Sequence, residues 1–177
     1  PLPVASTIVV ADRELLLVKR KNNPHKGEWC LPSGFAEIGE TIENASLREL
    51  EEETGIKGKI IDFVNVDSTY NKDYGDLIFI TFESEWMDGK LAAGDDAKEV
   101  KFFPFNKLPK LAFSSNTKAV HSYLQNKQEY WAIIDSFSRS IGEKQENINP
   151  PDYLSDKLIQ FIEKNAEIIS FRWLNDV

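Results

Sequence analysis

Four glutamates and one arginine stand at spacings that bring charged side chains together. Glu40 comes first, and Arg48, Glu49, Glu52 and Glu53 follow it along one short segment. Residues three and four apart are neighbours on a helix, so Glu49, Glu52 and Glu53 would repel one another there. Carboxylate oxygens are hard ligands that suit Mg²⁺, with Mn²⁺ as a substitute. The spacing therefore predicts a divalent cation whose coordination a phosphate-bearing substrate completes.

The helix that must carry these side chains is predicted over residues 42–54. Thr41 before it is a suitable N-cap, and Gly55 after it suits a left-handed stop. On a helical wheel of about 100° per residue, Leu50 faces one side, while Ala45 falls on the other side with the charged residues. The wheel predicts a core side and an acidic side.

An acidic run such as residues 51–53 is, by itself, most often a solvated helix face. The fixed positions around it argue against that interpretation. Gly34 is followed after five residues by Glu40, after seven more by Arg48, and then by glutamates and Gly55. The segment from Gly34 to Ile56 resembles the Nudix box, Gly-x5-Glu-x7-Arg-Glu-U-x-Glu-Glu-x-Gly-U, where U is a bulky aliphatic residue.

The resemblance implies a Nudix hydrolase, an enzyme that uses Mg²⁺ to cleave a nucleoside diphosphate linked to another group. Carried over by motif position, Glu49 and Glu53 are the strongest metal ligands, with Glu52 close behind. Arg48 should fix one of these glutamates through charge-assisted hydrogen bonds. Glu40, at the start of the helix, should stabilise the loop before it or bind a water on the metal. The backbone carbonyl of the residue before the box glycine often binds metal, and here that residue is Ser33.

The general base of the family often comes from a loop outside the box. Asp96 in the segment Gly94–Ala97 is the first candidate here, followed by Glu99 and Asp95. An ordinary turn explains the Gly-Asp-Asp sequence equally well.

Flanking residues suggest the substrate. The stretch Trp29-Cys30-Leu31-Pro32-Ser33-Gly34-Phe35-Ala36-Glu37 resembles ADP-ribose pyrophosphatases and their NADH-pyrophosphatase relatives, although the Ser-Gln-Pro-Trp-Pro-Phe-Pro signature of the latter is missing. We therefore expect ADP-ribose or a related dinucleotide or nucleotide sugar. Phe35, Tyr70 and Tyr74 could line the substrate pocket and stack on a base. Ordinary packing is the alternative for these aromatic residues.

Two other functions compete. A MutT-like enzyme would hydrolyse nucleoside triphosphates to monophosphates and pyrophosphate. A non-catalytic Nudix regulator would sense such a ligand and bind DNA, but its usual basic winged-helix module is not evident and the box is intact. The formal net charge of −8 also argues against binding a nucleic acid.

Composition sets broader limits. The 177 residues are 41% hydrophobic, without an apolar run of roughly 18 residues that would span a membrane. Cys30 is the sole cysteine, so neither a disulfide framework nor a zinc cluster is expected within this sequence. A reducing cytoplasm is the simplest inference. The sequence begins at Pro1 without an initiator Met, so it does not tell whether a segment such as a zinc ribbon precedes it.

The elements that position the box are read from hydrophobic patterns. Residues 6–10 and 15–20 are predicted to form a hairpin. Residues 59–66 and 77–85 are predicted strands joined by a tyrosine-bearing loop, and residues 100–105 form a further strand. Strands mixed with one strong helix indicate an α/β protein. The Nudix resemblance makes this a mixed β-sheet sandwiched between α-helices.

The C-terminal third is predicted to be helical. Apolar residues recur at helical spacing from about residue 115 onward. We expect a Nudix domain over residues 1–125 and a helical C-terminal extension over residues 126–177. The extension is slightly acidic, which favours packing on the main domain or on a second subunit in a homodimer, with a lid over the substrate as the alternative.

Overall fold

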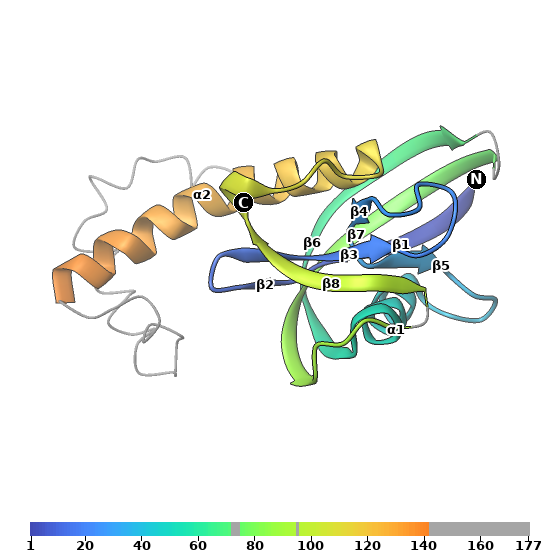
Figure 1. Ribbon diagram of the computed structural model, residues 1–177. Coiled ribbons are helices and arrows are strands. Elements are labelled where there is room, and N and C mark those ends of the chain that lie inside the picture. Colours follow the sequence, from blue (N-terminus) through green and yellow to red (C-terminus); the bar gives the residue numbers. More distant parts are fainter. Residues whose placement is uncertain (72–74, 95, 142–177) are drawn as a thin grey trace. The chain divides into compact units, whose positions relative to one another are not determined.

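The computed structural model describes residues 1–71, 75–94 and 96–141. The chain divides into two units, Pro1–Leu124 and Gln125–Val177. The strands of the first unit are β1 (Leu2–Ile8), β2 (Val10–Ala11), β3 (Glu14–Arg20), β4 (Trp29–Cys30), β5 (Ser33–Phe35), β6 (Ile56–Asn71), β7 (Gly75–Gly89) and β8 (Ala97–Pro104). Helix α1 spans Ile42–Thr54, a 3₁₀ turn spans Phe105–Lys107, and α2 runs over Ser114–Ile141 into the second unit (Figure 1).

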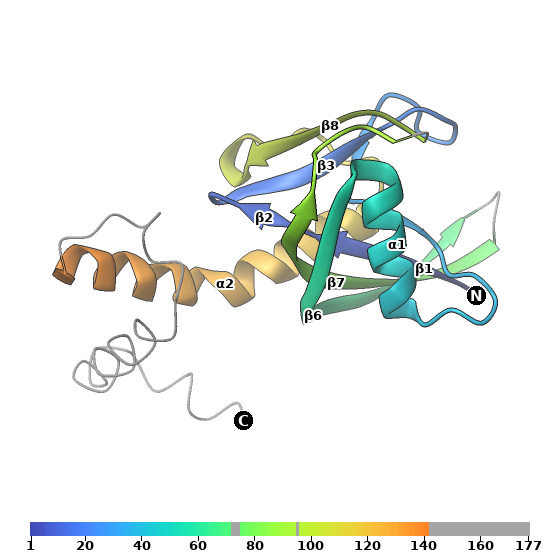
Figure 2. The same cartoon turned by 90° about the horizontal axis from the view of Figure 1, so that it is seen from below.

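The strands form two four-stranded sheets. The first sheet has the order β5-β1-β7-β6, with β1 and β7 parallel and the other pairs antiparallel. The second sheet places β3 beside β2, β4 and β8, all antiparallel. Figure 2 shows β3 and β8 on one side, and β1, β6 and β7 on the other. In Figure 1, α1 and the first turns of α2 lie on opposite sides of the strands, so the predicted α/β fold with a mixed sheet between helices is confirmed.

The predicted hairpin of residues 6–10 and 15–20 is wrong in its first arm. Within that arm, Val10 pairs with Leu15 and the Val9 carbonyl accepts a hydrogen bond from the Leu16 N–H, whereas residues 6–8 belong to β1 in the other sheet. The reason is burial. Val4 to Ile8 are all buried, and a strand buried on both faces is typical of the middle of a sheet with a neighbour on each side.

The predicted loop before residue 77 is also wrong over most of its length. Residues 67–71 continue β6, which pairs with β7 as far as Asn71 and Gly75. Val66, Thr69 and Tyr70 are good strand formers, and pairing along the whole hairpin outweighs the polar residues between them. Three register shifts between Lys57 and Asn65 bend this long ribbon. Tyr70 therefore lies on a strand.

Helix α1 begins and ends where the sequence predicts. The Thr41 hydroxyl accepts a hydrogen bond from the Asn44 backbone N–H at 3.2 Å. Gly55 adopts a φ of 72°, and its N–H bonds the Glu51 carbonyl. Leu50 is fully buried in the core with Val9, Leu16 and Ile56. The two caps fix the length of the helix. The burial of Leu50 fixes which face of the helix turns toward the core.

The wheel misplaced Ala45. This residue is fully buried, although it falls beside the charged residues on an ideal wheel. Its side of α1 packs toward the sheets because the helix lies close to β1 and β6. A Cβ on Gly58 of β6 would come within 2.7 Å of the Leu50 side chain, which shows how near the helix and strand approach. The acidic side of α1 is therefore narrower than the wheel predicts.

Helix α2 starts at Ser114 and continues without a break to Ile141. In the first unit, Ala119, Val120 and Tyr123 are buried, and the Tyr123 hydroxyl donates to Glu83 of β7 at 3.3 Å. In the second unit, residues 125–141 are the remainder of this helix. The extension predicted from residue 142 onward lies outside the described residues. No helix in the described ranges is long and apolar enough to cross a membrane.

Candidate active site

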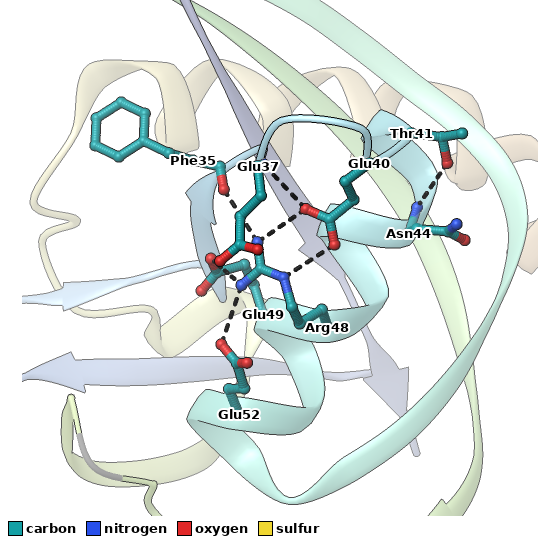
Figure 3. A network of polar contacts seen from close by, with 8 residues as sticks. All are labelled: Phe35, Glu37, Glu40, Thr41, Asn44, Arg48, Glu49 and Glu52. Atoms are coloured by element: carbon teal, nitrogen blue, oxygen red, sulfur yellow. Dashed lines mark hydrogen bonds and ion pairs between the residues drawn. The ribbon is translucent and has the colours of Figure 1, made fainter.

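Arg48 is the centre of a polar network on α1 (Figure 3). Its Nε and Nη2 donate to the two carboxylate oxygens of Glu40 at 2.9 and 3.1 Å. Its Nη1 donates to Glu49 at 2.7 Å and to Glu52 at 3.0 Å, and Nη2 also donates to the Phe35 carbonyl at 3.0 Å. A guanidinium has five N–H groups, so every donor of Arg48 is used within the protein.

Glu40 is held from two directions. Besides Arg48, the Glu37 backbone N–H donates to its Oε2 at 3.1 Å. These hydrogen bonds, led by that from Arg48, lower the pKa of Glu40. Charge-assisted bonds of this kind fix a loop firmly. Glu40 thus ties the loop before α1 to Arg48 on the helix.

Glu49 lies directly over Gly34 of β5. A Cβ at Gly34 would overlap the Glu49 carboxylate, so only glycine leaves room for this side chain. Burial raises the pKa of Glu49, and the hydrogen bond from Arg48 opposes that shift. The first glycine of the box therefore makes a space, and the glutamate fills it.

Glu53 reaches the same strand. Its Oε2 accepts a hydrogen bond from the Ser33 backbone N–H at 2.9 Å. Burial raises the pKa of Glu53 to about 8, while the bond from Ser33 opposes the shift. Glu53 is half-buried, because its side chain packs against β5. It therefore does not lie on a solvated helix face.

The backbone of Ser33 faces the same place. On an antiparallel strand, the N–H and C=O of one residue point to the same side. Beside β5, the Thr7 N–H of β1 donates to the Pro32 carbonyl, and the Ala36 N–H donates to the Pro3 carbonyl of β1. The Ser33 N–H instead turns away from β1 to Glu53. The Ser33 carbonyl therefore faces the side on which Glu53 lies.

A cavity of about 420 Å³ opens over these groups. Its walls combine the acidic side chains with two arginines and the β5 backbone. They are formed by Arg20, Asn22, Ser33, Gly34, Phe35, Ala36, Glu37, Arg48, Glu49, Glu53 and Asp96. A second cavity of about 90 Å³ has mainly apolar walls, formed by Val4, Arg20, Pro24, Ser33, Gly34, Phe35, Leu77, Phe79 and Phe113.

The structure brings most of the predicted site residues together. Glu49, Glu53, Ser33 and Asp96 all line the larger cavity, and Phe35 lines both cavities. The Asp96 carboxylate accepts a hydrogen bond from the Asn22 side chain at 2.8 Å. The negative charge of Asp96 also contributes to the raised pKa of Glu53. A loop after β7 thus places Asp96 in the wall of the cavity that Glu53 also lines.

Other predicted residues lie elsewhere. Glu52 is 59% exposed, pairs with Arg48 and does not line the cavity. Tyr70 is 73% exposed and lines neither cavity. Glu99 forms an ion pair with Lys19 at 3.5 Å, away from the cavity. Tyr74 and Asp95 lie outside the described residues.

Sequence reasoning missed Arg20, Asn22 and Glu37. Glu37 sits in the quoted motif, but its type alone gave no reason to single it out. Arg20 is the last residue of β3 and Asn22 follows it, and only the pairing of β3 with β8 brings them opposite Asp96. The sequence shows only a cation and an amide at the end of an apolar strand. This pattern is too common to assign either residue to a functional site.

The residues of the larger cavity fit Mg²⁺ in a particular way. Within the described residues, no three His, Cys, Asp or Glu side chains are grouped as a complete metal site. Mg²⁺ does not need such a group, because it keeps several waters and is bound through one or two carboxylates plus substrate phosphates. Glu49, Glu53 and the Ser33 carbonyl supply that kind of partial oxygen set. The donor set therefore fits Mg²⁺ or Mn²⁺.

Fold and site together define a class, namely an α/β protein with an acidic cavity suited to chemistry on phosphate. A model of the NUDIX domain matches residues 1–123. An ADP-ribose pyrophosphatase of Methanocaldococcus jannaschii is 45% identical over 126 residues, which are 71% of this chain and 74% of that protein. The chain therefore belongs to the Nudix family and is a Nudix pyrophosphohydrolase.

Solved structures agree on the fold. A NUDIX hydrolase from Nitrosomonas europaea matches with a TM-score of 0.64 at 24% identity, covering 73% of each chain. A MutT NUDIX hydrolase from Burkholderia pseudomallei also has a TM-score of 0.64 at 24% identity, covering 69% of this chain and 97% of that chain. At these identities, the likeness establishes the architecture alone.

Proposed function

We propose that this protein hydrolyses the pyrophosphate bond of ADP-ribose or a related nucleoside diphosphate derivative, with Mg²⁺ as cofactor and Mn²⁺ as a substitute. The observation that supports the proposal is that Glu49 and Glu53 both contact the Ser33–Gly34 backbone. Together these groups form one wall of an open cavity. The relative from Methanocaldococcus jannaschii, an ADP-ribose pyrophosphatase, favours ADP-ribose among the substrates.

Glu49, Glu53 and the Ser33 carbonyl would hold the cation, with Glu52 nearby as a further carboxylate. A bound Mg²⁺ neutralises phosphoryl oxygens, orients the attacking water and lowers its pKa. Arg48 and Glu40 are positioning residues, because the hydrogen bonds of Arg48 to Glu49 and Glu40, and of the Glu37 N–H to Glu40, set the place of Glu49 and of the box loop.

Asp96 is the proposed general base. Its Oδ1 is held by Asn22, which orients the carboxylate at the cavity wall. In the reaction, water attacks one phosphorus, the bridging P–O bond breaks, and the proton of the water passes to Asp96. ADP-ribose would give AMP and ribose 5-phosphate. Phe35, 41% exposed at the junction of the two cavities, is the proposed substrate-contacting aromatic residue.

A substrate panel with Mg²⁺ tests the proposal. The panel holds ADP-ribose, NADH, FAD, diadenosine polyphosphates, nucleotide sugars and nucleoside triphosphates, with products identified by chromatography. AMP and ribose 5-phosphate from ADP-ribose support it. A preference for triphosphates, releasing pyrophosphate, would instead establish the MutT-like function. Salt-sensitive DNA binding without turnover would point to the regulator.

The Glu53→Gln variant tests the site itself. It removes the charge and keeps the shape of a half-buried side chain. We expect kcat/KM to fall on the order of 10²- to 10³-fold, the usual effect of deleting one group that stabilises transition-state charge. Glu51→Gln, on the exposed part of the same helix, is the matched control and should keep full activity. Equal rates for Glu53→Gln and the unmodified protein would show that the metal site is elsewhere.

We also propose that the protein acts in the cytoplasm, and that the segment after residue 125 forms a separate helical extension that packs on the main domain or within a homodimer. The single, buried Cys30 supports a reducing compartment. Light scattering at several protein concentrations tests the homodimer, and a constant monomer mass would rule it out.

A further inference from the structure

The loop that follows β7 packs against the end of the box helix. The Ala92 N–H donates to the Thr54 carbonyl at 2.9 Å, and the Gly94 N–H donates to the Glu53 carbonyl at 3.1 Å. The last four carbonyls of a helix have no partner within the helix, and here the loop supplies donors for two of them. The end of α1 is therefore joined to this loop through backbone hydrogen bonds.

Gly94 approaches α1 more closely than any other residue type would allow. A Cβ at this position would overlap the Glu52 carbonyl oxygen and would lie 2.9 Å from the carbonyl carbon. Backbone atoms of a helix are held by hydrogen bonds along its axis, so they cannot yield as the end of a long side chain can. Gly94 has no positive φ, so glycine is needed here for close contact and not for an unusual backbone conformation.

The same loop reaches Asp96 two residues later. The Asp96 carbonyl accepts a hydrogen bond from the Lys21 N–H at 3.1 Å, and its carboxylate accepts one from the Asn22 side chain at 2.8 Å. Glu53 bonds Gly94 through its carbonyl and lines the larger cavity together with Asp96. The distance between the two carboxylates therefore depends on how closely Gly94 lies on the helix.

We propose that Gly94 is a positioning residue, which sets the distance between the Asp96 carboxylate and the metal-binding carboxylate of Glu53. The inference rests on the proposed function, in which Asp96 takes the proton of the attacking water. An added methyl group at Gly94 would lift the loop from α1 and carry Asp96 with it. Glu53 would keep its place, because its carboxylate is held by the Ser33 N–H.

Steady-state kinetics of Gly94→Ala test this role, together with a calorimetric titration of Mg²⁺. A misplacement of about 1 Å near a reacting centre can cost on the order of 100-fold in rate, so we expect kcat to fall by about that factor. KM and the affinity for Mg²⁺ should change little, because Gly94 lines neither cavity. Ala93→Ser, at the exposed neighbouring position, is the matched control and should keep the kcat of the unmodified protein.

Unchanged kcat in Gly94→Ala would overturn the proposal. A loss of Mg²⁺ affinity as large as the loss of kcat would do so as well, because that pattern indicates a general disturbance of the site.

A double variant shows whether Gly94 acts through Asp96. Once Asp96→Asn has removed the carboxylate, the place of that side chain matters little, so adding Gly94→Ala should reduce kcat only slightly further. Full additivity of the two losses would mean that Gly94 acts in another way, and the proposal would be wrong.

Amide hydrogen exchange gives a measurement that does not depend on activity. In Gly94→Ala, the N–H groups of Ala92 and Lys21 should lose protection, because they bond α1 and the Asp96 carbonyl. The Gly55 N–H, which bonds within the last turn of α1, should keep its protection. Unchanged protection at Lys21 would show that Gly94 does not set the place of Asp96.

The exchange experiment also separates this inference from the proposed function. If Asp96→Asn alone keeps full activity, the general-base assignment fails, and exchange at Lys21 still decides whether Gly94 places Asp96. If Gly94→Ala does not fold, Ala92→Pro replaces it, since it removes the N–H that bonds Thr54 and adds no clash at Gly94. Unmodified kcat and unchanged exchange at Lys21 in that variant would overturn the proposal.

Discussion

At the scale of single residues, one arginine sets the geometry of the acidic group. Like charges at helical spacing destabilise a helix by a few tenths of a kcal/mol per pair. Arg48 offsets this repulsion because it contacts Glu49 and Glu52 together and is itself held by Glu40. Glu53 receives no bond from Arg48 and is instead bonded by the Ser33 N–H. The two proposed metal ligands are thus held by different partners.

The raised pKa of Glu53 predicts how stability depends on pH. Burial moves the pKa from 4.5 to about 8, so between these values the folded protein binds more protons than the unfolded chain. Without metal, stability should therefore fall as pH rises through this range. Mg²⁺ requires the ionised carboxylate, so its stabilising effect should grow toward pH 8.

Thermal melts of the wild-type protein and of Glu53→Gln check this from pH 4.5 to pH 8, with EDTA and with Mg²⁺. In EDTA the variant should lose less stability than the wild type over this range, and Mg²⁺ should stabilise the variant little. The same dependence on pH in both proteins would contradict the assignment of the effect to Glu53.

Gly34→Ala tests the space that Glu49 occupies. The new Cβ would overlap the Glu49 carboxylate, and Gly34 has no positive φ, so the effect is steric alone. We expect kcat/KM to fall on the order of 100-fold, as for a displacement of about 1 Å at a reacting centre. Steady-state kinetics and Mg²⁺ titrations measure it.

A double variant provides the control for Gly34→Ala. Glu49→Asp shortens the displaced side chain by one methylene. If the clash is the cause, adding Glu49→Asp to Gly34→Ala should cost less than Glu49→Asp alone. Simple additivity of the two losses would argue that the added methyl group acts in another way.

At the scale of elements, α2 supports the strand that carries Ser33. The Asn116 side chain accepts a hydrogen bond from the Leu31 N–H at 3.2 Å, where both residues are buried. This bond fixes the backbone two residues before Ser33. Residues 31–33 are therefore held by two helices. The start of α2 accepts the Leu31 N–H through Asn116, and α1 accepts the Ser33 N–H through Glu53.

Asn116→Ala should therefore destabilise the protein by about 1–3 kcal/mol, because it leaves the buried Leu31 N–H without a partner. The adjacent Ser115→Ala is the matched control. Ser115 is also buried, but its hydroxyl has no hydrogen-bond partner among the described residues, so its removal should change stability by less than about 0.5 kcal/mol. Urea unfolding measures both, and equal losses would refute the role given to the Asn116 bond.

At the scale of the whole molecule, the cavity belongs to the first unit alone. Every residue lining either cavity lies between Val4 and Phe113, and the NUDIX domain match ends at residue 123. A protein truncated after Leu124 should fold and keep kcat/KM within a few fold of the full chain, since its core and site are complete. Circular dichroism and the ADP-ribose assay test this. A folded but inactive fragment would favour a lid role for the remaining residues.

The sequence determined the box helix and its chemistry. Caps at Thr41 and Gly55 fixed the bounds of α1, because capping is a local interaction of neighbouring residues. The fixed spacing of Gly34, Glu40 and Arg48 identified the family and hence the fold. Local patterns also located most strands, although the partner of β1 and the length of β6 depended on burial and long-range pairing.

Only the tertiary structure decided what surrounds the box. Arg20 and Asp96 lie far apart in sequence, and the pairing of β3 with β8 brings them to one cavity. The burial of Glu53 likewise depends on β5, not on its position on a helical wheel. The physical reason is that spacing within one helix fixes which side chains are neighbours, whereas solvent exposure and cavity walls depend on strands that meet only after folding.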